Sequence, residues 1–180
     1  MAEPSSWIMV DGKLNPHAMR ALYASGMAEE VISILQGTTY EALAGAGPLL
    51  ARVNANSEML ERWKANEPPL RYAWCFTSSL TPYELAAYWR RRLLIRGPME
   101  RTLWLRYADS RVMERGIEKN VFPDAFWGGV ESLQLFPQQG AWTPLSGKQA
   151  WEEPDDDALF PLFTFNERQL ASLSPAETVL

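Results

Sequence analysis

The 180-residue sequence has almost none of the side chains that form disulfides or hold transition metals. Its single cysteine, Cys75, excludes an intramolecular disulfide and a thiolate metal cluster. Its single histidine, His17, excludes a metal site that takes two histidine ligands from this chain. We therefore expect no metal site, and so few cysteines are typical of a protein from a reducing compartment.

Long hydrophobic runs are also missing. No stretch approaches the ~20 apolar residues that a membrane-spanning helix requires. Residues 1–4 include an acidic side chain where a secretory signal needs basic residues followed by an apolar run. We therefore expect a soluble protein of a reducing compartment that has no membrane partner.

Motifs for nucleotide binding and for nucleophilic catalysis are incomplete or absent. Residues 45–47 contain two glycines of a dinucleotide fingerprint, but Pro48 follows, and the segment ends a helix instead of opening one. A helix C-cap is the favoured interpretation. Lys148 is followed by Gln149 where a phosphate loop needs serine or threonine, and the Gly-x-Ser-x-Gly elbow does not occur. We expect the protein to bind no cofactor.

The sequence does contain enough apolar material for a folded domain. Hydrophobic residues make up 47% of the chain and charged residues 22%. A chain of this size buries roughly 70% of its unfolded surface. The net charge of −5 argues against a protein that binds nucleic acid over its whole surface.

Short apolar segments alternate with helical patterns up to about residue 120. This alternation predicts an α/β fold, a mixed β-sheet flanked by helices. After residue 120 we expect a C-terminal β-hairpin over 133–145, an acidic linker at 152–157 and a short helix opened by Asn166. The α/β domain would cover residues 1–150, and the linker with its helical appendage 151–180. The predicted strands cover residues 7–10, 31–35, 49–53, 71–77 and 102–108, and the predicted helices begin at Asn15, Thr38, Ser57, Thr81 and Asp109 or Ser110.

The clearest helix signal begins at Thr81, where a first-turn proline and a glutamate three residues on complete a capping box. A regular helix from there to residue 94 places Arg92 about 20° from Leu85, inside the apolar stripe. Burial of Arg92 requires a carboxylate partner, or an aliphatic part that is buried while the guanidinium reaches solvent. Asp109 is a candidate partner.

The strand before this helix is apolar on both faces. Trp74 and Phe76 share one face of residues 71–77, and Ala73 and Cys75 share the other. This pattern is typical of a central strand that is covered on each side. A buried, unreactive thiol is the favoured interpretation of Cys75.

Three further side chains are candidates for hydrolytic chemistry. Asp109 follows a strand and Asp124 lies in a loop, which makes them the best-placed acids for a paired-carboxylate mechanism. His17 stands in the first turn of a predicted helix, where an exposed position is the favoured interpretation. A small hydrolase that uses Asp109, Asp124 or His17 therefore stays open as an alternative.

Basic residues gather in the middle of the chain. Residues 90–119 hold nine basic and four acidic side chains, and residues 120–180 hold two basic and nine acidic ones. Pairing of these charges within the chain is the favoured interpretation, and a basic face that binds a partner is the alternative. Binding of nucleic acid through residues 90–119 is a weaker alternative, because the rest of the chain is acidic.

Six side chains are candidates for contacts to a partner protein. The cationic contacts would come from the basic segment, and the apolar anchors from tryptophans in a loop and an edge hairpin, although packing of the tail is a competing use for these tryptophans. The six candidates are Arg90, Arg91, Arg106, Arg111, Trp127 and Trp142.

Four segments, in the right order, resemble the effector chaperones or adaptors of type VI secretion, a family that carries a small domain of unknown function. The segments are residues 35–50, 80–96, 105–112 and 126–130. Within them, Gly47, Pro48, Asp109 and Gly128 are the candidate structural motif positions.

The resemblance implies a cytoplasmic protein without catalytic activity. Such a protein binds a toxic effector and loads it onto the spike protein of the secretion machine. Its partners would be that effector and that spike protein, with no nucleic acid.

Overall fold

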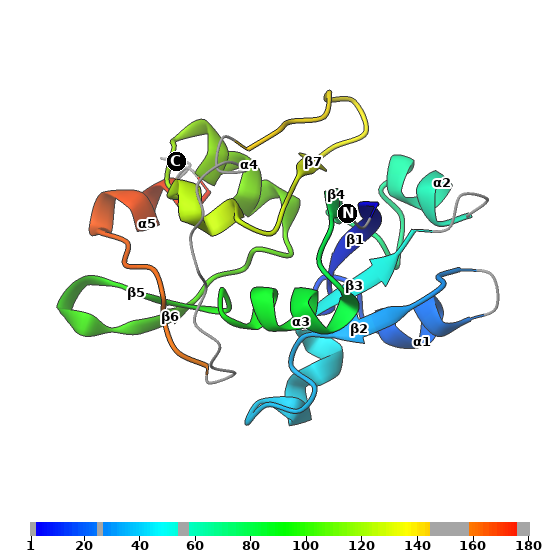
Figure 1. Cartoon of the computed structure of the whole chain (residues 1–180), viewed down its shortest axis with the longest axis horizontal. Coiled ribbons are helices and arrows are strands. Elements are labelled where there is room, and N and C mark those ends of the chain that lie inside the picture. The colour runs from blue at the N-terminus through cyan, green and yellow to red at the C-terminus, as the bar shows by residue number, and fades with distance from the viewer. Residues whose placement is uncertain (1–2, 25–26, 54–57, 145–158, 176–180) are drawn as a thin grey trace, which may run out of the picture.

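The computed structural model describes residues 3–24, 27–53, 58–144 and 159–175. Its centre is a five-stranded sheet with the strand order β2-β3-β1-β4-β7 (Figure 1). The alternation of strands and helices confirms the α/β fold class. The strands are β1 (Ser5–Asp11), β2 (Val31–Ser33), β3 (Pro48–Arg52), β4 (Trp74–Ser78) and β7 (Ser132–Gln134).

Every pairing in this sheet is antiparallel, whereas the sequence predicted strands of mixed direction. The pairings make β1 and β2 run the same way, and likewise β3 and β4. In each case another strand is inserted between the two: β3 lies between β1 and β2, and β1 lies between β3 and β4. Parallel strands therefore exist in this sheet but are never neighbours.

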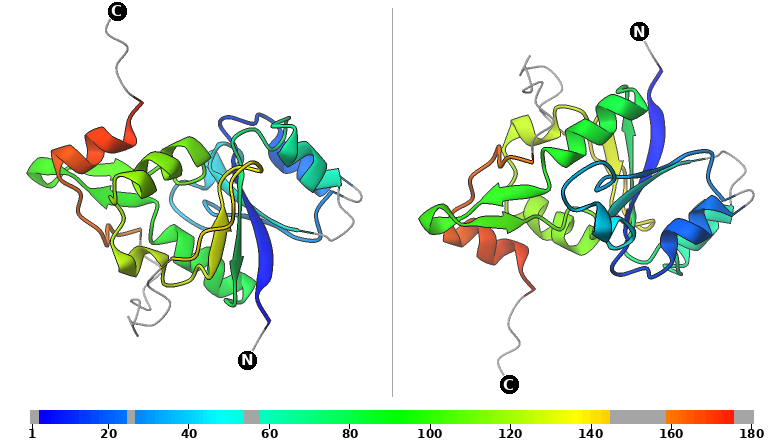
Figure 2. Two further views of the ribbon diagram at one scale, coloured as in Figure 1. Left: turned by 90° about the horizontal axis from the view of Figure 1, so that it is seen from above. Right: turned by 90° about the horizontal axis from the view of Figure 1, so that it is seen from below.

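Two short helices cover one face of the sheet. They are α1 (Ala18–Tyr23) and α2 (Glu58–Lys64), which lie on the same side of the strands in Figure 2. Ile8 and Val10 of β1 point to this face and pack in one buried cluster with Leu22, Met59 and Trp63.

The opposite face carries the larger core, built on aromatic rings. Trp74 and Phe76 of β4 point to it, as the sequence predicted, while Ala73 and Cys75 contribute to the other face. The helix α3 (Pro82–Arg90) packs Trp89 against this face, with its ring centroid 5.8 Å from that of Trp74. The predicted capping box at the start of α3 is confirmed.

The end of α3 differs from the prediction. The helix ends at Arg90, and the expected last turn instead contains a bend and the strand β5 (Leu94–Arg96). This strand pairs with β6 (Thr102–Trp104) across the short 3-10 helix η2 (Pro98–Glu100) to form a second, two-stranded sheet. Pairing satisfies the backbone of residues 94–96, the first of which helical periodicity alone assigns to the helix. Figure 1 shows this hairpin extending away from α1 and α2.

The helix α4 (Ser110–Glu118) begins at Asp109, whose side chain accepts a hydrogen bond from the backbone N–H of Arg111. After α4, the predicted aromatic loop forms the 3-10 helix η3 (Asp124–Trp127). The predicted hairpin is confirmed where it is described, because Leu133 and Trp142 exchange two backbone hydrogen bonds of 2.8 Å.

The described part of the tail packs on the main core. The helix α5 (Glu167–Leu173) is opened by Asn166, as predicted, which forms a capping box with Gln169, and it lies against α4. Phe165 and Leu173 are buried in the same core cluster as Trp89. The predicted domain boundary at residue 150 and the acidic linker lie outside the described residues.

Two predicted helix starts are wrong. Asn15 does not cap α1, which begins after His17; its amide instead donates to the carbonyls of Asp11 and Arg71 and accepts from the N–H of Arg71. Residues near Thr38 form the 3-10 helix η1 (Glu41–Ala46) in place of an α-helix. The predicted cap at residue 57 lies outside the described residues. Within the described ranges, none of the helices is long and apolar enough to cross a membrane.

Candidate functional site

Two adjoining grooves lie where the β5–β6 hairpin meets the rest of the molecule. We call them the arginine groove, about 620 Å³, and the apolar groove, about 510 Å³. They share Trp104, Leu105 and Arg106. The arginine groove has a floor of Ile95, Leu103, Leu105, Val112, Leu170 and Leu173 and a rim of Arg101, Arg106, Arg111 and Arg115. The apolar groove is lined mainly by apolar residues. These are Leu35, Leu43, Ala46, Gly47, Pro48 and Leu93.

Arg106, predicted as a partner contact, stands between the two grooves. Its guanidinium Nη2 lies 2.5 Å from Oδ2 of Asp11, at the end of β1. The Asp11 carboxylate is nearly buried and also accepts the backbone N–H groups of Lys13 and Leu14. Asp11 therefore holds Arg106 in place, while 42% of the arginine side chain is exposed.

Arg111, a second predicted contact, is fixed by Asp109 and Tyr72. Its Nε and Nη2 donate to the two carboxylate oxygens of Asp109 at 3.1 and 2.9 Å. The guanidinium carbon lies 3.8 Å from the centroid of the Tyr72 ring. The hydrogen bond to Asp109 raises the pKa of Arg111 above its ordinary value. Asp109 thus serves as both the helix cap and the anchor of a rim arginine.

Trp104 forms the ridge between the grooves, and sequence reasoning did not single it out. Its side chain is 45% exposed, and its ring forms a T-shaped pair with that of Tyr40 at a centroid distance of 4.8 Å. Leu43, 55% exposed, lines the apolar groove nearby. Strand alternation could have found Trp104, because it shares the solvent side of β6 with Thr102.

Gly47 and Pro48, predicted as structural motif positions, form part of the wall of the apolar groove. The N–H of Gly12 donates to the carbonyl of Gly47 at 3.0 Å. A Cβ atom on Gly12 would lie 2.2 Å from the carbonyl oxygen of Gly45, so this approach of two backbones requires glycine. A Cβ on Gly47 would lie 2.5 Å from the side chain of Leu35.

Arg90 and Arg91 lie outside the grooves, at the end of α3. Arg90 donates from Nε and Nη2 to the carbonyls of Ile34 and Gln36, both at 2.9 Å. It therefore ties α3 to the connection between β2 and η1. Arg91 is the C-cap residue of α3 and is partly exposed. Partner contacts by these two arginines stay predictions.

Arg92 is completely buried beside them. Its guanidinium donates to the carbonyls of Tyr88, Ala125 and Phe126 and lies 3.5 Å from the centroid of the Tyr88 ring. The suggested partner, Asp109, binds Arg111 instead. Backbone carbonyls and an aromatic face therefore contribute to the burial of this cation.

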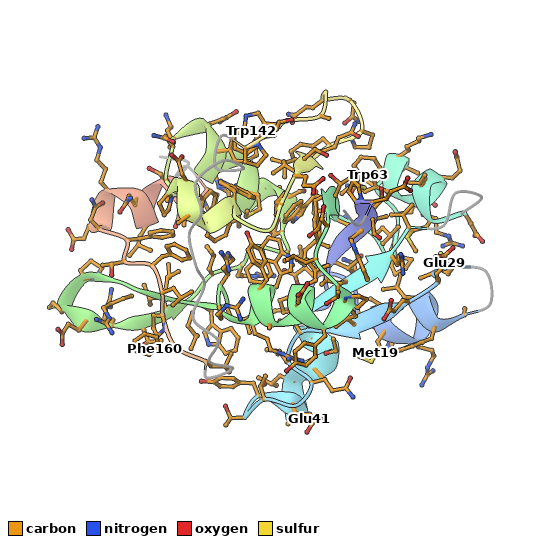
Figure 3. All side chains as sticks on the ribbon, in the orientation of Figure 1. Met19, Glu29, Glu41, Trp63, Trp142 and Phe160 are labelled. Carbon is orange, nitrogen blue, oxygen red and sulfur yellow. The ribbon has the colours of Figure 1, made fainter. Side chains whose placement is uncertain are left out.

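Neither of the two predicted tryptophan anchors lines a groove. Figure 3 shows Trp142 over the part of the molecule that holds α4 and β7. Trp127 is only 4% exposed, and its ring packs edge-on against Trp142 at 5.6 Å. Trp142 is 38% exposed and lines a small hollow of about 170 Å³. Trp127 therefore contributes to the core, and Trp142 is the one of the two that offers surface to a partner.

Gly128, the last predicted motif position, caps η3. An added Cβ there would make only an ordinary contact, 3.6 Å from the carbonyl of Ala125. At Gly129 it would lie within 2.9 Å of both Leu80 and Tyr88. The packing of this loop thus depends on the second glycine of the pair.

Of the candidate hydrolytic residues, Asp109 lines the arginine groove, whereas His17 and Asp124 line neither groove. Among the described residues, no hydrogen bond or ion pair joins His17, Asp109 and Asp124 to one another. His17 and Asp124 are exposed, whereas Asp109 is buried against Arg111. Burial raises the pKa of the Cys75 thiol to about 12, which keeps it protonated at neutral pH. In the same residues, no group of three or more histidine, cysteine or acidic side chains could hold a metal ion.

A family model described as a domain of unknown function, DUF4123, matches residues 6–118. The chain belongs to this family. The match includes three of the four segments that carry the resemblance, and the fourth, residues 126–130, follows it. No curated protein and no solved structure matches the chain.

The DUF4123 domain provides nearly all of both grooves. The apolar groove consists entirely of residues within the match, as do the four rim arginines of the other groove. The end of α5 adds one wall of the arginine groove from outside the match, through Leu170, Leu173 and the two residues after them. Trp127 and Trp142 lie beyond the DUF4123 domain.

Proposed function

We propose that this protein is a non-enzymatic adaptor that binds a type VI secretion effector and loads it onto the spike protein. The observation that carries the proposal is the DUF4123 match over residues 6–118. It supports the resemblance of the sequence to adaptors that carry a small domain of unknown function. In this proposal the protein acts in the cytoplasm and makes or breaks no covalent bond.

The geometry of the grooves supports a binding role. An exposed tryptophan beside apolar floors is the kind of anchor that dominates binding energy in protein interfaces. The arginines at the rim would mainly raise the rate of encounter and set the register of the bound chain. Carboxylates hold Arg106 and Arg111 before any partner arrives, so less side-chain freedom is lost on binding.

Co-expression tests this proposal. The tagged chain is produced together with the effector and the spike protein encoded beside it and is purified at low salt. We expect the effector to co-purify with the chain, and the spike protein to join when all three are present. Purification of the chain without either protein would contradict the proposal. Nuclease treatment of the lysate serves as the control, because capture through nucleic acid would be lost.

A further inference from the structure

We infer that the arginine groove and the apolar groove together bind one acidic, amphipathic segment of the client effector. Apolar side chains of that segment would fill the two floors, and its aspartate or glutamate side chains would pair with the rim arginines. The inference rests on the proposed function, since it specifies which part of the client the adaptor holds and where.

Charge is the first observation that points to this occupant. Five cationic and two anionic side chains line the two grooves, a local charge of +3 on a chain whose net charge is −5. Both anions, Asp11 and Asp109, already bind arginines of the rim. A positive patch on an acidic molecule favours a negatively charged partner and steers it there. The five cations are Lys13, Arg101, Arg106, Arg111 and Arg115.

The rim arginines still have donors to offer. Arg101 is exposed, and in the described part of the chain its side chain makes no hydrogen bond or ion pair. Arg106 donates to Asp11 through Nη2, and Arg111 donates to Asp109 through Nε and Nη2. Since a guanidinium carries five N–H donors, each can still bind a carboxylate of the partner.

The apolar floors distinguish a peptide from a nucleic acid. Leu103, Leu105 and Val112 line the arginine groove together with its arginines, and Leu35 and Leu93 line the second groove. Aliphatic surface makes no favourable contact with a phosphate backbone, but it gains free energy when it covers apolar side chains. Leu105 and Trp104 line both grooves and connect them, so one segment of the partner can occupy both.

The experiment measures the affinity of the purified chain for the co-expressed effector. The test variants are Arg101→Glu, which removes no internal contact among the described residues, and Trp104→Ala. The matched controls are Arg168→Glu, an exposed arginine on α5 outside both grooves, and Tyr83→Ala, a 76% exposed aromatic at the start of α3. We expect Kd to rise about tenfold or more in each test variant and less than twofold in each control.

An exchange of charges between the effector and the groove then identifies the effector segment that the groove binds. Overlapping peptides of the effector are assayed against the wild-type chain, and the acidic residues of the binding peptide are changed to lysine. We expect these lysines to weaken binding to the wild type and to restore part of the affinity of Arg101→Glu. Melting temperatures of all variants show that each is folded.

The outcomes separate the two proposals. If the wild type and all variants capture the effector equally, the groove assignment is wrong while the adaptor function stands. If the wild type captures neither effector nor spike protein, the proposed function is wrong, and the groove assignment that rests on it is wrong as well. If the chain instead binds a single-stranded oligonucleotide, and Arg101→Glu abolishes that binding, then a nucleic acid and not a client peptide occupies the grooves.

Discussion

Arginines gather in two regions of this molecule, the end of α3 and the rim of the arginine groove, but they have different partners there. At the end of α3, Arg90 and Arg92 donate to backbone carbonyls and connect separate segments of the chain. At the rim, Arg106 and Arg111 bind carboxylates and keep 42% of each side chain exposed. A basic run in a sequence therefore divides into residues that stabilise the fold and residues that can meet a partner.

Arg92→Met gives the sharpest test of the first region. Methionine fills part of the volume, but the carbonyls of Tyr88 and Phe126, in buried hydrogen bonds, and that of Ala125, in a partly buried one, lose the same cationic donor. We expect the free energy of unfolding to fall by about 3–5 kcal/mol, measured by urea denaturation. Arg168→Met is the control for loss of an exposed arginine. An unchanged unfolding midpoint in Arg92→Met would show that the carbonyls find other donors.

Trp104→Ala gives the corresponding test of the second region. We expect it to raise the Kd for the effector about tenfold or more, a loss of about 1.4 kcal/mol or more, because the exposed ring lines both grooves. The urea midpoint should change little by comparison. The comparison of the two regions breaks down if Trp104→Ala unfolds the protein or if Arg92→Met weakens capture in molecules that are still folded.

Arg90→Ala asks whether the end of α3 also contributes to binding. The substitution removes two hydrogen bonds, to Ile34 and Gln36, from a partly exposed side chain. We expect a loss of about 1–2 kcal/mol in stability and unchanged capture of the effector. A drop in affinity without a drop in stability would assign Arg90 to the partner surface, as the sequence first indicated.

Two substitutions separate the two roles of Asp109, which caps α4 and pairs with Arg111. Asp109→Asn keeps an acceptor for the N-cap hydrogen bond but weakens the pair with Arg111, whereas Asp109→Ala removes both. We expect a loss of under 1 kcal/mol for the first, since Arg111 is 42% exposed, and about 1 kcal/mol more for the second. Thermal melting of the two variants measures the difference.

The reactivity of the Cys75 thiol measures how often the fold opens, and it can be compared between variants of the two regions. This is the smallest of the expected effects. Because its pKa is about 12 in the folded state and lower when unfolded, the folded chain retains a proton that the unfolded chain loses. This contribution to stability is complete below about pH 8 and is lost progressively as the pH rises from there towards 12.

At pH 8 we expect slow reaction with a disulfide reagent in the wild type and in Arg106→Ala, and faster reaction in Arg92→Met. Equal rates in all three would show that the reagent reaches Cys75 without opening of the fold.

Local signals in the sequence predicted those features that depend on neighbouring residues. The capping box at Thr81 and the helix caps at Asp109 and Asn166 occur as expected, because the partner of each cap lies within three residues. The two faces of β4 also follow directly from alternation. The end of α3 was predicted wrongly, because Leu94 pairs in the β5–β6 sheet and residues 91–93 form the bend that leads into it, which overrides the helical periodicity.

The candidate site was predicted only in part. Arg106, Arg111, Asp109, Gly47 and Pro48 do meet around the two grooves. The wall contributed by α5 comes from about 60 residues further along the chain, and no local pattern connects it to the rim.

The sequence alone determined the α/β class, the helix caps, the two apolar faces of β4 and membership of the DUF4123 family, since each is encoded in short-range patterns or in residue identity. Only the tertiary structure decided which arginines are bound to carbonyls and which stand at a rim. The physical reason is that a guanidinium takes its partners from whatever the fold places within about 3 Å. For Arg90 and Arg106 those partners lie 54 to 95 residues away in the sequence, where no local pattern announces them.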